Sequence, residues 1–218
     1  MSAQDRRFSG RITGIGSTSG VRLVVGHWDV SPFGAFADVM VEDASGRRTL
    51  LAPTDEIARF VSGTYEFDDV AVAPIDAAWS PPHERAGQPH TGGVCRVRTD
   101  RLELTVEVGG RSGVGRLLRL MPTALATAPW WCRAIDPVAR RVMPGVRTAG
   151  STGRGRSEFY GATDLRKIRA VHGSWDGTDL GSIADVWPPA RFGFSSVPRR
   201  PAMTTIVTTV RDRAAGEP

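Results

Sequence analysis

The sequence predicts a mainly β protein, an antiparallel barrel or sandwich with a short-helix insertion around residues 113–143. Valine outnumbers leucine by 22 to 11, and glycine and proline together make 40 of the 218 residues. β-branched residues suit a pleated strand, while glycine and proline break strands with turns. Residues 102–108 also alternate strictly between apolar and polar side chains. The length fits one domain with one core, so residues 1–218 are expected to form a single β-rich domain.

The first half of the chain contains three predicted strands. Residues 8–15, 21–30 and 35–42 are rich in valine and isoleucine, and each is bounded by small or turn-forming residues. The loop 16–20 is expected to connect the first two strands. The segment 31–34, with the sequence Ser-Pro-Phe-Gly, is expected to turn the chain into the third.

The second half is predicted to add further strands. Residues 94–108 form a hairpin that turns at 99–100, and an Asp-Gly pair within 175–177 predicts another tight hairpin because it supplies positive φ angles. Residues 192–195 and 204–210 complete the expected strands. The alternation places four apolar side chains on one buried face: Leu102, Leu104, Val106 and Val108.

One short helix is predicted immediately after residue 53. Thr54 is a suitable N-cap, and Asp55 and Glu56 place acidic groups in the first turn, where the helix dipole favours them. Apolar residues follow at helical spacing. Gly63 is expected to end the helix.

The insertion 113–143 is predicted to contain two or three short helices rather than a long one. Pro122, Pro129 and Pro137 divide it, and proline interrupts a helix because it lacks the backbone N–H. Asp136 before Pro137 fits an N-cap followed by proline at the first helical position. A single helix that continues past Pro137 is the alternative.

No metal site or cofactor is expected. His83 and His90 lie in the Pro-rich loop 81–93. Six residues separate His83 from His90 and four separate His90 from Cys95, unlike the usual zinc-ligand pairs. The glycine-rich segment 145–156 lacks the Gly-Lys-Ser/Thr ending of a phosphate-binding loop. It is therefore predicted to be a connecting loop.

The sequence predicts a cytoplasmic protein. Residues 1–20 lack the order of basic and apolar regions of a signal peptide, and the uncharged stretch 121–132 is shorter than the ~20 residues of a spanning helix. Cys95 and Cys132 are expected to be free, buried thiols.

An enzymatic function would need several polar residues to meet in one cleft. His27 and Asp29 point to the same side of a strand and could act as base and orienting group. His172 and Lys167 are the other catalytic candidates, and a lysine beside cations could form a Schiff base. The alternative is that His27 is a strand-end histidine and that Lys167 is a surface residue.

A non-enzymatic module that binds a small apolar ligand is the preferred interpretation. Small β-barrels can enclose a cavity, and ligand pockets are mainly apolar. Four tryptophans are the candidates for the mouth of such a cavity, and a position in the core is the alternative for each: Trp28, Trp79, Trp175 and Trp187.

Residues 111–157 form a basic segment, with nine arginines against one acidic residue, Asp136. Because 27 of the 28 basic residues are arginine and asparagine is absent, a GC-rich genome explains the arginine abundance, but not this clustering. Interleaved cationic and apolar groups are typical of a helix on an anionic membrane surface. Nucleic acid is a less favoured partner, and a helical flap packed on the barrel is the alternative. The candidate surface residues are Arg116, Arg119, Trp130, Trp131, Arg133, Arg140 and Arg141.

Four phrases of the sequence, at 31–41, 51–54, 63–68 and 191–201, resemble those of a group of actinobacterial proteins to which no activity is assigned. In architecture the chain is also similar to lipocalin-like β-barrels and to the acetoacetate decarboxylase-like fold. The latter resemblance implies a catalytic lysine, and Lys167 is the sole lysine of the chain. An enzyme of the acetoacetate decarboxylase-like or lipocalin-like barrel type is therefore an alternative function.

Overall fold

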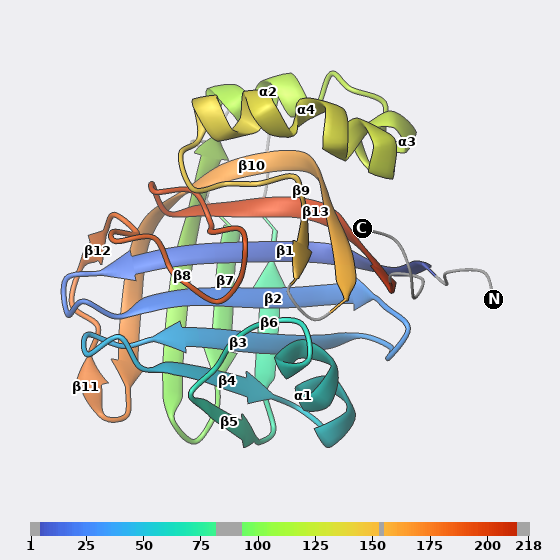
Figure 1. Cartoon of the computed structure of the whole chain (residues 1–218). Helices are drawn as coiled ribbons and strands as arrows, with labels where there is room; N and C mark the ends of the chain where they lie inside the picture. The colour runs from blue at the N-terminus through green and yellow to red at the C-terminus, as the bar shows by residue number, and fades with distance from the viewer. Residues whose placement is uncertain (1–4, 82–92, 153–154, 213–218) are drawn as a thin grey trace.

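The computed structural model describes residues 5–81, 93–152 and 155–212 and confirms a mainly β architecture. Ten strands form one curled sheet, a half-barrel, in the order β5-β4-β3-β2-β1-β13-β10-β8-β7-β6, and only the β4–β5 pair is parallel. Figure 1 shows β7 and β8 running across behind β1 to β4. The ten strands are β1 (Asp5–Ser17), β2 (Arg22–Val30), β3 (Phe36–Glu42), β4 (Arg48–Ala52), β5 (Asp69–Val72), β6 (Asp76–Ser80), β7 (Gly93–Arg98), β8 (Leu102–Arg111), β10 (Arg156–Trp175) and β13 (Ala202–Asp212).

Three short strands and four helices complete the described fold. The strands β9 (Ala149–Thr152) and β11 (Thr178–Asp179) pair with β10, and β12 (Ile183–Ala184) pairs with β1. Helix α1 (Asp55–Ser62) follows β4. Between β8 and β9 lie α2 (Gly113–Leu118), α3 (Thr123–Ala126) and α4 (Pro129–Val142), which together are called the helical layer and lie above β10 in Figure 1.

Most predicted local structure is confirmed. Strands β1, β2 and β3 match the three strands expected before residue 43, and the hairpin around Thr99 joins β7 to β8. Asp176 and Gly177 have φ angles of 47° and 76°, as the tight turn between β10 and β11 requires. Thr54 caps α1 by accepting a hydrogen bond from the backbone N–H of Ile57, and Gly63 follows the last turn.

Three expectations about local structure were wrong. Residues 192–195 are irregular, because Phe192 and the residues beside it pack over the sheet instead of pairing with it. The glycine-rich segment contains a strand, β9, since residues 149–152 pair with the start of β10. Asp136 does not start a new helix, because α4 continues from residue 129 through Pro137 to residue 142, which was the alternative.

Asp136 is held inside α4 by contacts to the next segment of the chain. Its carboxylate accepts hydrogen bonds from the backbone N–H groups of Thr148 and Ala149 and forms an ion pair with Arg147 at 3.0 Å. Burial is the largest single effect on the pKa of Asp136 and raises it. The hydrogen bonds and the charge of Arg147 together outweigh burial, so the pKa is lowered. The aspartate that was predicted to start a helix therefore fastens the middle of α4 to β9.

The sheet buries apolar side chains on both faces. One face of β1 to β4 packs against β7 and β8 through the largest apolar cluster, and the four alternating residues of β8 belong to it, each 0–1% exposed. That burial confirms the register predicted for residues 102–108. On the opposite face, α1, the helical layer and residues 190–198 cover β1, β2, β3, β13 and the start of β10.

Candidate ligand-binding cavity

A cavity of about 340 Å³ lies on that opposite face, between the sheet and the helical layer. Its volume falls in the range of small-molecule pockets, roughly 300–1,000 Å³. Even-numbered residues of β1, β2 and β3 form its floor, since successive side chains of a strand point to opposite faces. The floor is mostly apolar and includes Phe8, Ile12, Val24, Trp28, Phe36 and Met40.

The cavity opens between α2 and α4. Leu117, Val138 and Val142 line it, and they are nevertheless 66%, 50% and 58% exposed. Side chains that border both the cavity and the solvent mark its mouth. A ligand could therefore enter between these two helices without disrupting the sheet.

Two buried carboxyl groups interrupt the apolar lining. Asp38, on β3, accepts a hydrogen bond from Nε1 of Trp28 at 2.9 Å, and burial raises the pKa of Asp38 to about 7. Glu158, on β10, is 1% exposed, and burial likewise raises its pKa to about 7 in spite of hydrogen bonds from two tyrosines. Each group can donate or accept a proton near neutral pH.

Tyr65 and Tyr160 form a closed ring of contacts with Glu158. The Tyr160 hydroxyl oxygen lies 2.7 Å from Oε2 of Glu158, the Tyr65 hydroxyl oxygen lies 3.1 Å from Oε1, and the two hydroxyl oxygens are 2.8 Å apart. Burial raises the pKa of both tyrosines, so both stay protonated at neutral pH. The ring gives the cavity one polar end.

Thr208 and Ser196 leave hydrogen-bonding capacity unused in the cavity wall. Within the described part of the chain, the hydroxyl oxygens of both residues are buried and have no hydrogen-bond partner. A buried polar group without a partner is destabilising, and each such group in a native structure needs a specific explanation. A ligand could supply the missing partners.

The tryptophans predicted at the cavity mouth occupy four different environments. Trp28 lines the cavity. Trp79 is partly exposed beneath the guanidinium of Arg11, and Trp175 belongs to the apolar cluster between the two strand layers. Trp187 is exposed next to Arg199. Of the four, only Trp28 is positioned to contact a ligand in this cavity.

The catalytic candidates lie outside the cavity. His27 and Asp29 meet at the end of β2, with Nε2 and Oδ1 3.7 Å apart, and burial is the main cause that lowers the pKa of His27. His172 lies on β10, 3.9 Å from a carboxylate oxygen of Glu107, and Lys167 is exposed on the same strand. None of the four lines the cavity. The convergence that the enzyme hypothesis requires is therefore not found there.

Two further sequence-based candidates concern metals and membranes. His83 and His90 lie outside the described residues, and no group of three or more His, Cys, Asp or Glu side chains within the described ranges is placed to hold a metal ion. Over the same ranges, no helix has both the length and the apolar character needed to cross a membrane. Cys95 and Cys132 are free and buried, as expected.

Sequence reasoning missed the polar end of the cavity. Asp38 lies between apolar residues in the middle of the predicted strand 35–42, and this acidic residue was the available signal. Tyr65, Glu158 and Tyr160 come from a loop and a strand about ninety residues apart, and no motif connects them. Comparisons with protein-family models, with curated proteins and with solved structures find no match for this chain, so its candidate site is defined by this geometry.

Proposed function

We propose that this protein binds a small, largely apolar molecule in the cavity between the sheet and the helical layer. The cavity itself carries the proposal: about 340 Å³ of mostly apolar space with a mouth between α2 and α4 and a few hydrogen-bonding groups at one end. Burial of apolar ligand surface provides about 25 cal/mol per Å². The polar groups then fix the orientation of the ligand.

A saturable, single-site interaction with an alkyl alcohol tests this function. Titration with decan-1-ol is expected to change the tryptophan fluorescence, because Trp28 and Trp131 both line the cavity. Native mass spectrometry is expected to show one bound molecule per chain. A linear, unsaturable response with no bound species would overturn the proposal.

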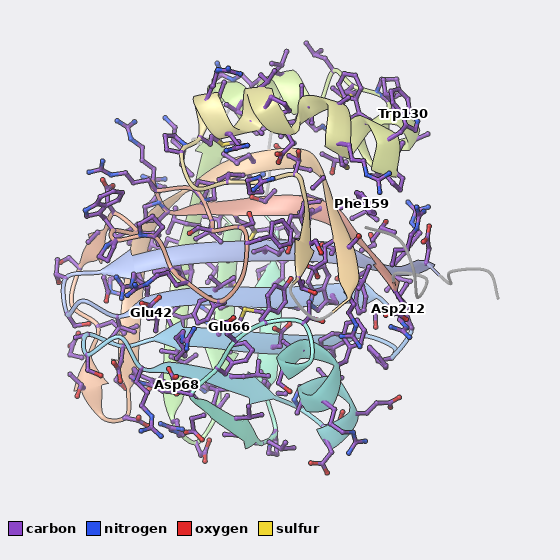
Figure 2. All side chains as sticks on the ribbon, in the orientation of Figure 1. Glu42, Glu66, Asp68, Trp130, Phe159 and Asp212 are labelled. Atoms are coloured by element: carbon purple, nitrogen blue, oxygen red, sulfur yellow. The ribbon has the colours of Figure 1, made fainter. Side chains whose placement is uncertain are left out.

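A second proposed function, attachment of the helical layer to an anionic membrane, is supported by its exposed side chains. Leu120 and Trp130 are 81% and 61% exposed, and Figure 2 shows Trp130 on the helical layer, away from the sheet. The helical layer also carries exposed arginines, among them Arg116, Arg119, Arg133, Arg140 and Arg141. Trp131 instead faces the cavity. A membrane bound here would lie against the cavity mouth, so an apolar ligand could pass directly from lipid into the protein.

Charge reversal on α4 is expected to weaken vesicle binding. One basic residue near an anionic membrane contributes about 1 kcal/mol, so Arg140→Glu/Arg141→Glu should reduce binding by about tenfold or more. Co-sedimentation with phosphatidylserine-containing and neutral vesicles at two salt concentrations measures this. Arg96→Glu/Arg98→Glu makes the same charge change on β7 and should have a smaller effect. Vesicle binding that depends on neither lipid charge nor salt concentration would contradict this function.

A further inference from the structure

We propose that the bound molecule carries a protonated amine at its polar end and that Glu158, Tyr65 and Thr208 hold this ammonium group. The inference rests on the proposed ligand-binding function and names the chemical class of the ligand. It follows from the number of protons that the polar end of the cavity needs and from the charges around it.

The ring of Glu158, Tyr65 and Tyr160 needs three protons. Its three oxygen–oxygen contacts, at 2.7, 2.8 and 3.1 Å, are all within hydrogen-bond distance, and each requires one hydrogen between the oxygens. The two tyrosines supply two hydrogens. Without ligand, the third is the proton of a neutral Glu158, in agreement with the pKa of about 7 that burial gives this group.

An ammonium group can replace that third proton. The longest of the three contacts, between the Tyr65 hydroxyl oxygen and Oε1 of Glu158, is the one from which a proton is lost most easily. A protonated amine that donates to these two oxygens leaves Glu158 ionised, and one proton passes to the solvent. Charge and hydrogen count therefore balance, with a carboxylate–ammonium pair in place of a neutral acid.

Thr208 offers a third acceptor beside this ring. It is the cross-strand neighbour of Tyr160 in the β10–β13 pair, and its buried hydroxyl has no partner among the described residues. A primary ammonium group has three N–H donors and no acceptor. Glu158, Tyr65 and Thr208 together match this number of donors.

The charges around the cavity favour a cation over an anion. Asp38 is a second buried acid in the lining and is near enough to raise the pKa of Tyr65. Arg147, which also lines the cavity, is already paired with Asp136. Arg156 lowers the pKa of Glu158 and thereby helps it to ionise. Among the described residues of the lining, a ligand carboxylate or phosphate would meet two acids and no unpaired cation.

Isothermal titration with three probes of equal chain length, decylamine, decan-1-ol and decanoate, tests the inference. At pH 8 decylamine is expected to bind about tenfold or more tightly than decan-1-ol, since a charge-assisted pair is added. Between pH 8 and pH 6 its affinity should fall by about tenfold, because Glu158 must then lose a proton to bind. The amine itself stays protonated over this range. Titrations in two buffers of different ionisation enthalpy should show release of about one proton at pH 6 and little or none at pH 8, where Glu158 is already largely ionised.

Glu158→Gln keeps the shape of the side chain and should abolish both the preference for the amine and the pH dependence. Glu107→Gln makes the same change at an exposed position on β8 and should leave both intact.

If decan-1-ol binds but decylamine binds no more tightly, or if decanoate binds best, the inference fails while the proposed function stands. If no probe binds, the proposed function itself fails. If Glu158→Gln does not fold, Asp38→Asn decides the question, because it removes the other buried acid with a pKa of about 7 and should leave the pH dependence of decylamine binding intact.

Discussion

Replacing Arg22 with methionine is expected to lower the free energy of unfolding by about 3–5 kcal/mol, because the change removes the nearest cation from the buried carboxylate of Glu42 and leaves it Arg191 at 3.9 Å. Arg22 and Glu42 form a cross-strand pair between β2 and β3, with Nη2 and Oε1 2.9 Å apart. Glu42, labelled in Figure 2, is 0% exposed. The loss should be larger than for an exposed ion pair, which contributes about 0–1 kcal/mol.

The same pair holds the segment that walls the cavity. Arg22 donates to the backbone carbonyl of Pro188 at 3.2 Å, and Glu42 accepts from the backbone N–H of Arg191 at 3.0 Å. Residues 190–198 line the cavity just beyond these contacts. The Arg22→Met variant is therefore also expected to bind decan-1-ol more weakly than the wild-type protein.

Urea denaturation followed by circular dichroism measures the stability change. The double variant Arg22→Met/Glu42→Leu removes both charges and should recover much of the lost stability, since apolar residues can replace a buried ion pair with little loss. Arg98→Met removes an arginine from the exposed pair with Glu103 and serves as the matched control. A loss below about 1 kcal/mol for Arg22→Met would show that solvent reaches Glu42.

The sequence indicated the fold where one face of an element is buried. The alternation in β8 and the capped turn of α1 are local patterns that arise from one-sided burial, and both were confirmed. Strand β4 was missed because Thr49, Leu50, Leu51 and Ala52 are all buried, so no alternation is visible. Most of β10 was missed because its pairing with β13 and β8 shifts register, which breaks the period of two.

The candidate site could not be predicted because its residues meet only in three dimensions. Interleaved apolar and cationic groups were recognised in residues 111–157, but the sequence does not say whether the apolar groups meet a membrane or the sheet. In the structure Trp131, Ile135 and Val138 line the cavity, whereas Trp130 remains exposed. The acids of the cavity were hidden because an isolated buried carboxyl gives no local pattern.

Filling the cavity from β10 is expected to weaken ligand binding strongly. Ala162 lies on β10, lines the cavity and is the cross-strand partner of Ile206, so a larger side chain at this position projects into the space that the ligand needs. Ala162→Phe should weaken the binding of decan-1-ol by about a hundredfold or more, equivalent to about 2.7 kcal/mol. Tryptophan fluorescence titration measures the affinity, and thermal unfolding shows whether the fold is retained. Ala44→Phe adds the same ring at an exposed turn between β3 and β4 and should leave binding unchanged. A folded Ala162→Phe protein that binds as tightly as the wild type would place the ligand elsewhere on the molecule.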